Sequence, residues 1–139
     1  MFKRIDHVGV IVDNLEEAER FLRRLQLSAV REVTIPGLLK GVFYLCGDTQ
    51  IELIEVIDDQ ERAQRLGGDK ARVEHIAMEV EDLEKTAQAL RGLGVRFTGE
   101  PQKSGNTLIS FTVPETCDGV MYQLIQKNLS PDAGDQISR

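Results

Sequence analysis

An internal repeat with a shift of 68 positions is the feature of this 139-residue chain that most restricts its fold. Residues 5–16 (IDHVGVIVDNLE) align with residues 73–84 (VEHIAMEVEDLE), and the match continues without a gap as far as Leu25 and Leu93. In both copies an alternating apolar segment precedes an acidic residue and a leucine-rich helical pattern. The chain is therefore predicted to contain two copies of one supersecondary unit.

Each copy predicts one strand, one helix and three further strands. Residues 4–12 and 72–80 are β-branched and alternate in polarity, which is typical of strands. Asn14 and Asp82 are suitable N-cap residues, and Gly94 suits the end of the second helix. The remaining strands are expected at about 28–34, 39–46 and 50–57 and at about 95–98, 107–113 and 119–126. The predicted fold is α+β, with two tandem βαβββ modules forming a curved mixed sheet.

The predicted domain covers residues 1–127, with module one at about 4–57 and module two at about 72–127. Residues 58–71 are rich in charge and contain Gly67 and Gly68, so they are predicted to link the modules. Residues 128–139 are polar and are predicted to be a mobile tail.

Charge and hydropathy restrict the partners and the location. The net charge of −6 argues against nucleic acids and anionic membranes as partners, because both attract basic surfaces. The chain has no apolar run of 18 residues and no apolar signal-peptide core, so a cytoplasmic protein is expected. Cys46 and Cys117 lie far apart without CxxC spacing and are expected to be free, partly buried thiols.

Four polar residues interrupt apolar strands at matched positions of the two copies. The chain has two histidines, and the repeat aligns them with each other. The segments IELI and YQLI, in the last strand of each copy, align with a shift of 71 and add one carboxylate and one amide. Each module therefore supplies a histidine from its first strand and an oxygen ligand from its last strand: His7 and Glu52, and His75 and Gln123.

These four residues predict a divalent metal site. Burying such groups costs several kcal/mol unless something satisfies them, and a pseudo-two-fold axis would bring them together. Two imidazole nitrogens, a carboxylate oxygen and an amide oxygen suit Zn²⁺, Co²⁺, Ni²⁺ or Mn²⁺, and the sequence leaves the metal open. A single strand histidine is more often a hydrogen-bonded core residue, but the matched set favours metal binding.

At these residues the chain resembles the vicinal oxygen chelate (glyoxalase/bleomycin-resistance) superfamily, and within it the methylmalonyl-CoA epimerases. The resemblance covers about residues 4–127. It is clearest in the segments IDHVGV, QIELIE, VEHIAMEV and PETCDGVMYQL. It implies a homodimer whose concave sheet holds one metal ion. The implied ligands are His7, Glu52, His75 and Gln123.

The chain differs from those epimerases in two respects. Their glutamate ligand lies on the last strand and their glutamine ligand on the earlier one, whereas here Glu52 is early and Gln123 late. Gln123 cannot act as the acid/base residue that the last-strand glutamate is credited to be. A double histidine at the third ligand position is also absent, because Glu74 precedes His75.

A metal facing a carbonyl predicts enolate chemistry, and the resemblance implies that the substrate is a small-molecule thioester. The predicted function is epimerisation of methylmalonyl-CoA or a related 2-substituted malonyl or acyl thioester, with Glu52 as the catalytic acid/base. No second proton carrier is evident among Glu55, Glu74 and Glu79. Three basic residues are weak candidates for binding the CoA phosphates, which leaves the substrate-binding residues unassigned: Lys40, Arg72 and Lys103.

Three other functions stay open on the same scaffold. A lactoylglutathione lyase would use the same enolate chemistry but favours two carboxylate ligands. A non-catalytic small-molecule binder would not need all four ligand-type residues. An extradiol dioxygenase would want a carboxylate where Gln123 stands.

Overall fold

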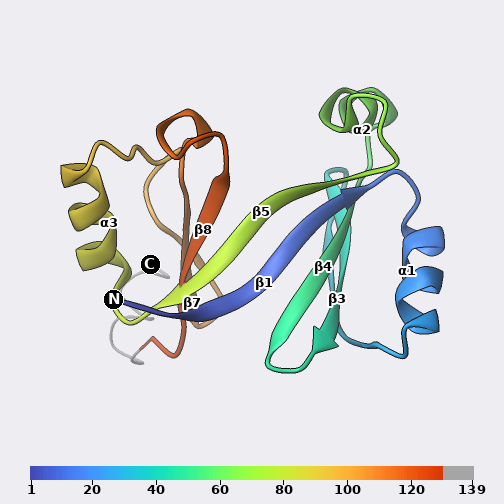
Figure 1. Ribbon diagram of the computed structural model, residues 1–139, viewed down its shortest axis with the longest axis horizontal. Helices are drawn as coiled ribbons and strands as arrows, with labels where there is room; N and C mark the ends of the chain where they lie inside the picture. Colours follow the sequence, from blue (N-terminus) through green and yellow to red (C-terminus); the bar gives the residue numbers. More distant parts are fainter. Residues whose placement is uncertain (130–139) are drawn as a thin grey trace. The chain divides into compact units, whose positions relative to one another are not determined.

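The computed structural model describes residues 1–129, and its elements follow the order of two βαβββ modules with one additional helix between them (Figure 1). The first module consists of β1 (Phe2–Val12), α1 (Leu15–Arg24), β2 (Ser28–Ile35), β3 (Leu39–Cys46) and β4 (Thr49–Val56). The second consists of β5 (Ala71–Val80), α3 (Leu83–Gly92), β6 (Gln102–Ser104), β7 (Thr107–Phe111), a 3₁₀ turn (Pro114–Thr116) and β8 (Met121–Gln126). The predicted α+β class and the mixed sheet are confirmed.

Helix α2 (Asp59–Leu66) lies within residues 58–71, where the sequence predicted only a connection. Asp58 caps it by accepting a hydrogen bond of 2.8 Å from the Glu61 N–H. Leu66 is buried and packs with Ile11 and Val56. The helix was missed because its eight residues, DQERAQRL, carry too few apolar side chains to produce a helical pattern.

The strand predicted at 95–98 is wrong. Phe97 forms an isolated bridge with Thr112, and the strand itself comes later, as the three-residue β6. Gly94 has a positive φ, and Gly99 and Pro101 interrupt the segment, so it cannot build a continuous ladder. From residue 130 onward the predicted tail lies outside the described residues.

Both helices begin as the sequence predicts. Asn14 and Asp82 accept hydrogen bonds of 3.0 Å from the backbone N–H groups of Glu17 and Lys85. The last strand of each module adds a second cap, since Glu55 accepts from the Leu15 N–H and Gln126 from the Leu83 N–H, each at 2.8 Å. Each helix start is thereby fixed to the strand that carries a predicted ligand.

Contacts divide the chain into two compact units, and the first, here called the amino-terminal unit, comprises residues 7–74. Its strands lie in the order β2-β3-β4-β1, with β1 parallel to β4 and the other pairs antiparallel. The core under α1 consists of Val12, Leu22, Val42, Tyr44 and Leu53. Side chains alternate along strands, so the neighbouring positions on β1, β3 and β4 point to the face opposite α1.

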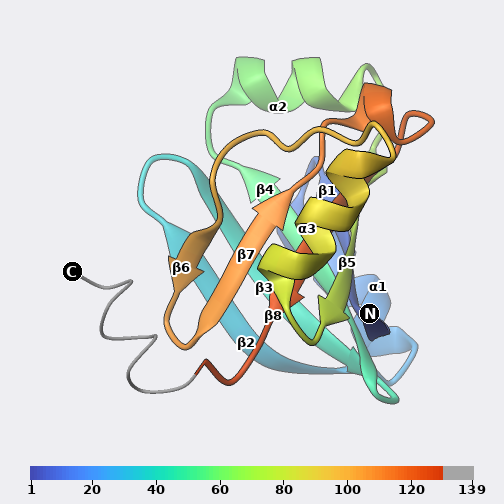
Figure 2. The ribbon, with the colours of Figure 1, turned by 90° about the vertical axis from the view of Figure 1, so that its left-hand side faces the viewer.

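The carboxy-terminal unit comprises residues 1–6 and, within the described part of the chain, residues 75–129. Its strands lie in the order β5-β8-β7-β6, with β5 parallel to β8 (Figure 2, in which α3 faces the viewer). The core under α3 contains Val80, Leu83, Leu108 and Leu124. By the same alternation, odd-numbered residues of β5, β7 and β8 point away from α3.

Two further observations concern the chain as a whole. No helix within residues 1–129 combines the length and apolar character needed to cross a membrane. Cys46 and Cys117 are free thiols as predicted, but Cys46 is exposed and only Cys117 is half-buried.

Candidate metal centre

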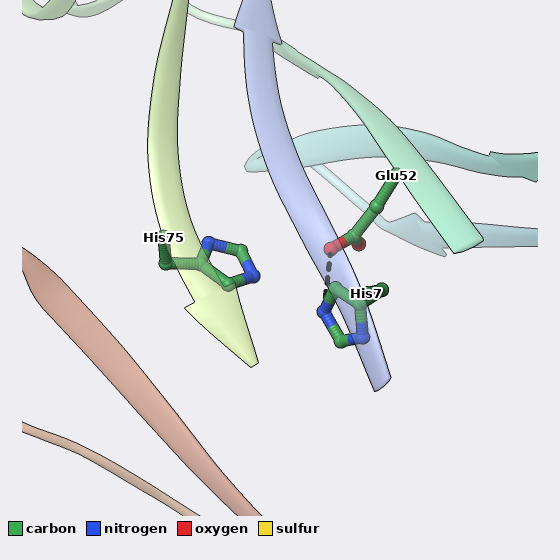
Figure 3. A group of neighbouring side chains, drawn as sticks. All are labelled: His7, Glu52 and His75. Carbon is green, nitrogen blue, oxygen red and sulfur yellow. Dashed lines mark ion pairs between the residues drawn. The ribbon is translucent and has the colours of Figure 1, made fainter. Parts of the chain in front are cut away.

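The amino-terminal unit brings together His7 and Glu52. His7 lies on β1 and Glu52 on the adjacent parallel strand β4, in a register that pairs Gly9 with Glu52. His7 is buried, and its Nε2 lies 3.4 Å from Oε1 of Glu52, whose side chain is 12% exposed (Figure 3). Two donors bound about 2.1 Å from a tetrahedral cation also lie about 3.4 Å apart, so this pair fits a metal as well as an ion pair.

An aromatic ring and a glycine shape this pair. Phe43 of β3 pairs with Glu52 across the sheet and meets the His7 ring edge-on, with centroids 5.1 Å apart. A Cβ atom at Gly41, two residues earlier, would lie 3.4 Å from Oε2 of Glu52. The ring orients the imidazole, and the glycine leaves room for the carboxylate.

The carboxy-terminal unit repeats this arrangement with His75 and Gln123. His75 is buried on β5 and meets Phe111 of β7 edge-on, with centroids 5.7 Å apart. Gln123 pairs with Phe111 on one side and with Ala77 on the other, as Glu52 pairs with Phe43 and Gly9.

The amide oxygen of Gln123 supplies the test of whether a cation fits. Oε1 is buried and has no hydrogen-bond partner among the described residues. A buried acceptor without a partner costs about 1–3 kcal/mol, which a bound cation would offset. Imidazole, carboxylate and amide oxygen are all donor types that suit a divalent metal.

Figure 3 shows three of the four predicted ligands, namely the two histidines and the glutamate. His7, Glu52 and His75 each offer one ligand atom, and these atoms all lie within 4.8 Å of one another. That all four residues are metal ligands stays a prediction, and it enters the proposal below.

The acidic residues considered as a second proton carrier all have structural partners. Glu55 accepts the hydrogen bond from the start of α1, and Glu74 forms an ion pair with Arg65. The buried Glu79 lies 3.4 Å from Lys3 and 3.6 Å from Arg4. Each of the three carboxylates therefore has a structural contact of its own.

Of the basic residues suggested for the CoA phosphates, Lys40 points away from His7 and Glu52, and Arg72 has an acidic partner. Lys40 lies on β3 at a position that alternates with Gly41 and so belongs to the α1 face. Arg72 forms an ion pair with Asp69 at 3.7 Å. The structure instead places Arg31 on the site face, with its guanidinium carbon 4.1 Å from the centroid of the Phe43 ring.

The sequence reasoning missed Phe43, Phe111 and Arg31. The two phenylalanines differ by 68 positions, the same shift as His7 and His75, so the repeat held the signal for them. Arg31 had no such signal, because residue 99, at the same shift, is a glycine.

Comparison with known proteins gives one family. Residues 4–124 match the model of the Glyoxalase/Bleomycin resistance protein/Dioxygenase superfamily. The mitochondrial methylmalonyl-CoA epimerase of Bos taurus is 30% identical over 129 residues, covering 88% of this chain and 74% of the relative.

Solved structures agree with the fold. Methylmalonyl-CoA epimerase from Mycobacterium tuberculosis superposes with a TM-score of 0.80 at 24% identity, covering 96% of this chain and 93% of that one. A methylmalonyl-CoA epimerase in complex with methylmalonyl-CoA and NH4+ gives 0.79 at 24% identity, covering 94% and 100%. The predicted resemblance is confirmed: the chain belongs to the Glyoxalase/Bleomycin resistance protein/Dioxygenase superfamily.

Proposed function

We propose that this chain is a divalent-metal-dependent epimerase of methylmalonyl-CoA or a related 2-substituted malonyl or acyl thioester. Its curated relatives are methylmalonyl-CoA epimerases, which supports an isomerase. The observation that carries the proposal is the donor group of His7, Glu52 and His75, whose ligand atoms lie within 4.8 Å of one another.

The proposed ligands are the two histidines, Glu52 and Gln123, around Co²⁺, Zn²⁺, Ni²⁺ or Mn²⁺. When bound, such a cation supplies positive charge that stabilises the negative charge developing on a substrate carbonyl oxygen. The orphaned Oε1 of Gln123 supports its place in this set. The edge-on rings of Phe43 and Phe111 contact the imidazoles and support their positions.

Glu52 is the proposed acid/base residue. Its carboxylate takes the proton from the α-carbon of the acyl group, and the electron pair of that C–H bond moves towards the carbonyl oxygen. Glu55, Glu74 and Glu79 are engaged elsewhere, which supports Glu52 in this role. One carboxylate serves one face of the substrate, so inversion needs proton return from the other face.

Proton exchange and inversion should therefore be measured separately. We expect metal-loaded protein to exchange the α-proton of methylmalonyl-CoA in D₂O, followed by NMR, and to invert the centre, followed by a stereospecific assay. Glu52→Gln should lower both rates at least about a hundredfold, the size of a lost general acid/base. The matched control Glu16→Gln changes a carboxylate whose side chain is 82% exposed on α1 and should leave them unchanged.

Two results would contradict the proposal. Activity on the methylglyoxal–glutathione adduct without α-proton exchange on methylmalonyl-CoA would instead indicate a lactoylglutathione lyase. Protein that binds none of the four metals would indicate a non-catalytic binder.

A homodimer is also part of the proposal. Phe21 is 57% exposed and lines an apolar groove of about 500 Å³ with Ile51 and Leu53, which supports an apolar contact with another chain. Sedimentation equilibrium should give twice the monomer mass, and a monomer at all concentrations would contradict it. The cytoplasmic location stays a prediction.

A further inference from the structure

Arg31 occupies an unusual place beside the proposed metal ligands. It pairs with Phe43 between β2 and β3, immediately after a shift of register between Ala29 and Arg31. Its guanidinium carbon lies 4.1 Å from the centroid of the Phe43 ring. The Phe43 and His7 rings meet edge-on, with their centroids 5.1 Å apart. Arg31 and His7 therefore contact the same aromatic ring, and Phe43 pairs with Arg31 on one side and with Glu52 on the other.

The guanidinium is exposed and holds no acidic partner within residues 1–129. Arginines on the two nearby helices are different, since Arg23 pairs with Glu19 and Arg62 with Asp59. Stacking on Phe43 fixes the plane of the guanidinium while leaving its N–H groups available. An exposed, oriented guanidinium is suited to bind a carboxylate through two hydrogen bonds.

The repeat does not explain this cation. At the corresponding place of the carboxy-terminal unit, the Thr98 N–H donates to the Phe111 carbonyl oxygen at 2.9 Å. No described guanidinium lies over Phe111, and Thr98, Gly99 and Phe111 instead line a cavity of about 120 Å³. Arg31 is thus present in only one of the two modules. A residue that contacts one end of an asymmetric ligand is expected to break the repeat in this way.

The net charge of the proposed metal site indicates which class of ligand Arg31 would bind. Two neutral histidines, neutral Gln123, anionic Glu52 and a divalent cation leave the proposed site with one net positive charge. The enolate of a carboxylated acyl thioester carries two negative charges at the reacting end, whereas that of an uncarboxylated acyl thioester carries one. A second positive charge beside the site favours the carboxylated class.

We propose that Arg31 binds the free carboxylate of the acyl group and so selects carboxylated acyl thioesters over uncarboxylated ones. This inference rests on the proposed function and adds the residue that recognises its substrate class. Both oxygens of that carboxylate can accept hydrogen bonds from the planar guanidinium.

Binding rather than turnover tests it. Malonyl-CoA and propionyl-CoA share the CoA arm and differ at the carboxylate, so titration of metal-loaded protein with each isolates that group. Wild type should bind malonyl-CoA more tightly. Arg31→Gln should weaken malonyl-CoA binding about ten- to one-hundredfold, as expected for charge-assisted hydrogen bonds, and change propionyl-CoA binding less than about twofold. Arg31→Lys should recover part of the loss.

The control Arg24→Gln removes an exposed arginine from the end of α1 and should leave both affinities unchanged. Equal loss for both ligands in Arg31→Gln would place Arg31 on the CoA phosphates and overturn the inference. Wild type that does not distinguish the two ligands would overturn it as well, without need of a variant.

The outcomes separate this inference from the proposed function. Suppose that wild type does not invert methylmalonyl-CoA, but that Arg31→Gln selectively weakens malonyl-CoA binding. The epimerase proposal is then excluded, and the proposed role of Arg31 is retained. Suppose instead that wild type inverts methylmalonyl-CoA and that Arg31→Gln binds malonyl-CoA as tightly as wild type. The proposed role of Arg31 is then excluded, and the epimerase proposal is retained.

Discussion

At the residue scale, the candidate ligands are polar side chains that are largely buried in apolar strands, and we explain their burial by the proposed metal binding. The four residues predicted to be ligands could be singled out in the sequence because each interrupts an apolar strand at a position repeated in the other module. Arg31 could not be predicted as a site residue, because its importance comes from stacking on Phe43. No sequence pattern indicates that contact between the two strands. Residues set by the repeat were predictable, and those that break it were not.

Replacing Gln123 by leucine should have opposite effects on stability and on metal binding. Loss of the buried, unpartnered Oε1 should stabilise the metal-free protein by about 1 kcal/mol, whereas metal affinity should fall at least about tenfold. Urea denaturation with a chelator and metal titration measure the two effects.

Gln126→Leu is the matched control, since the Gln126 side chain accepts a hydrogen bond from the Leu83 N–H at the start of α3. It should destabilise the protein by about 1 kcal/mol and leave metal affinity unchanged. Equal destabilisation by both substitutions would mean that Gln123 has a structural partner and is not a vacant ligand.

Gly41→Ala should weaken metal binding without unfolding the protein. Its Cβ would press on Oε2 of Glu52, the mobile end of a side chain, so the carboxylate shifts by a few tenths of an ångström and the backbone stays in place. We expect metal affinity to fall a few-fold, by about 1 kcal/mol, with unfolding by urea unchanged. Gly92→Ala, where nothing lies within 4 Å of the new Cβ, is the control; equal affinities in both variants would show that Gly41 does not shape the site.

At the scale of elements, prediction succeeded where a helix or strand carries its own pattern. Helices α1 and α3 have both a cap and a leucine stripe, and both begin where expected. Helix α2 was missed because it depends on Asp58 and on burial of Leu66 against Ile11 and Val56, a contact that exists only in the folded unit. Strand β6 was misplaced because three residues give no alternation to detect.

The hydrogen bond from Tyr44 of β3 to Glu19 of α1 predicts that the free energy of unfolding depends on pH. Burial, and then a hydrogen bond of 2.8 Å donated to Glu19, raise the pKa of the Tyr44 hydroxyl above its usual value, against the opposing effect of Arg23. A raised pKa in the folded state means that stability is present while the group is protonated and is lost as pH rises. The free energy of unfolding should therefore fall as pH increases above about 10.

Tyr44→Phe should remove this part of the alkaline loss, which urea denaturation at pH about 8 and about 11 would measure. The variant loses the hydrogen bond to Glu19 and is expected to be less stable at the lower pH by about 1 kcal/mol. A variant with the same loss on going to alkaline pH as wild type would contradict the assignment.

At the scale of the whole molecule, the duplication was the most informative property of the sequence. It predicted two βαβββ modules, equivalent ligand positions and equivalent helix caps, because a repeated unit repeats its hydrogen bonds and its burial. The repeat showed the exchange of Glu52 for Gln123, but it could not show that Arg31 stacks on Phe43 in one half whereas a cavity lies beside Phe111 in the other. We attribute the charge and the substrate class to that difference.

The central claim is that one divalent cation is held jointly by donors of both modules. The direct measurement is metal stoichiometry and affinity after chelation and reloading, in wild type and in the single variants His7→Ala and His75→Ala. We predict one ion per chain in wild type and a loss of affinity of at least about tenfold in each variant. Two ions per chain, or wild-type affinity in either variant, would contradict a shared metal.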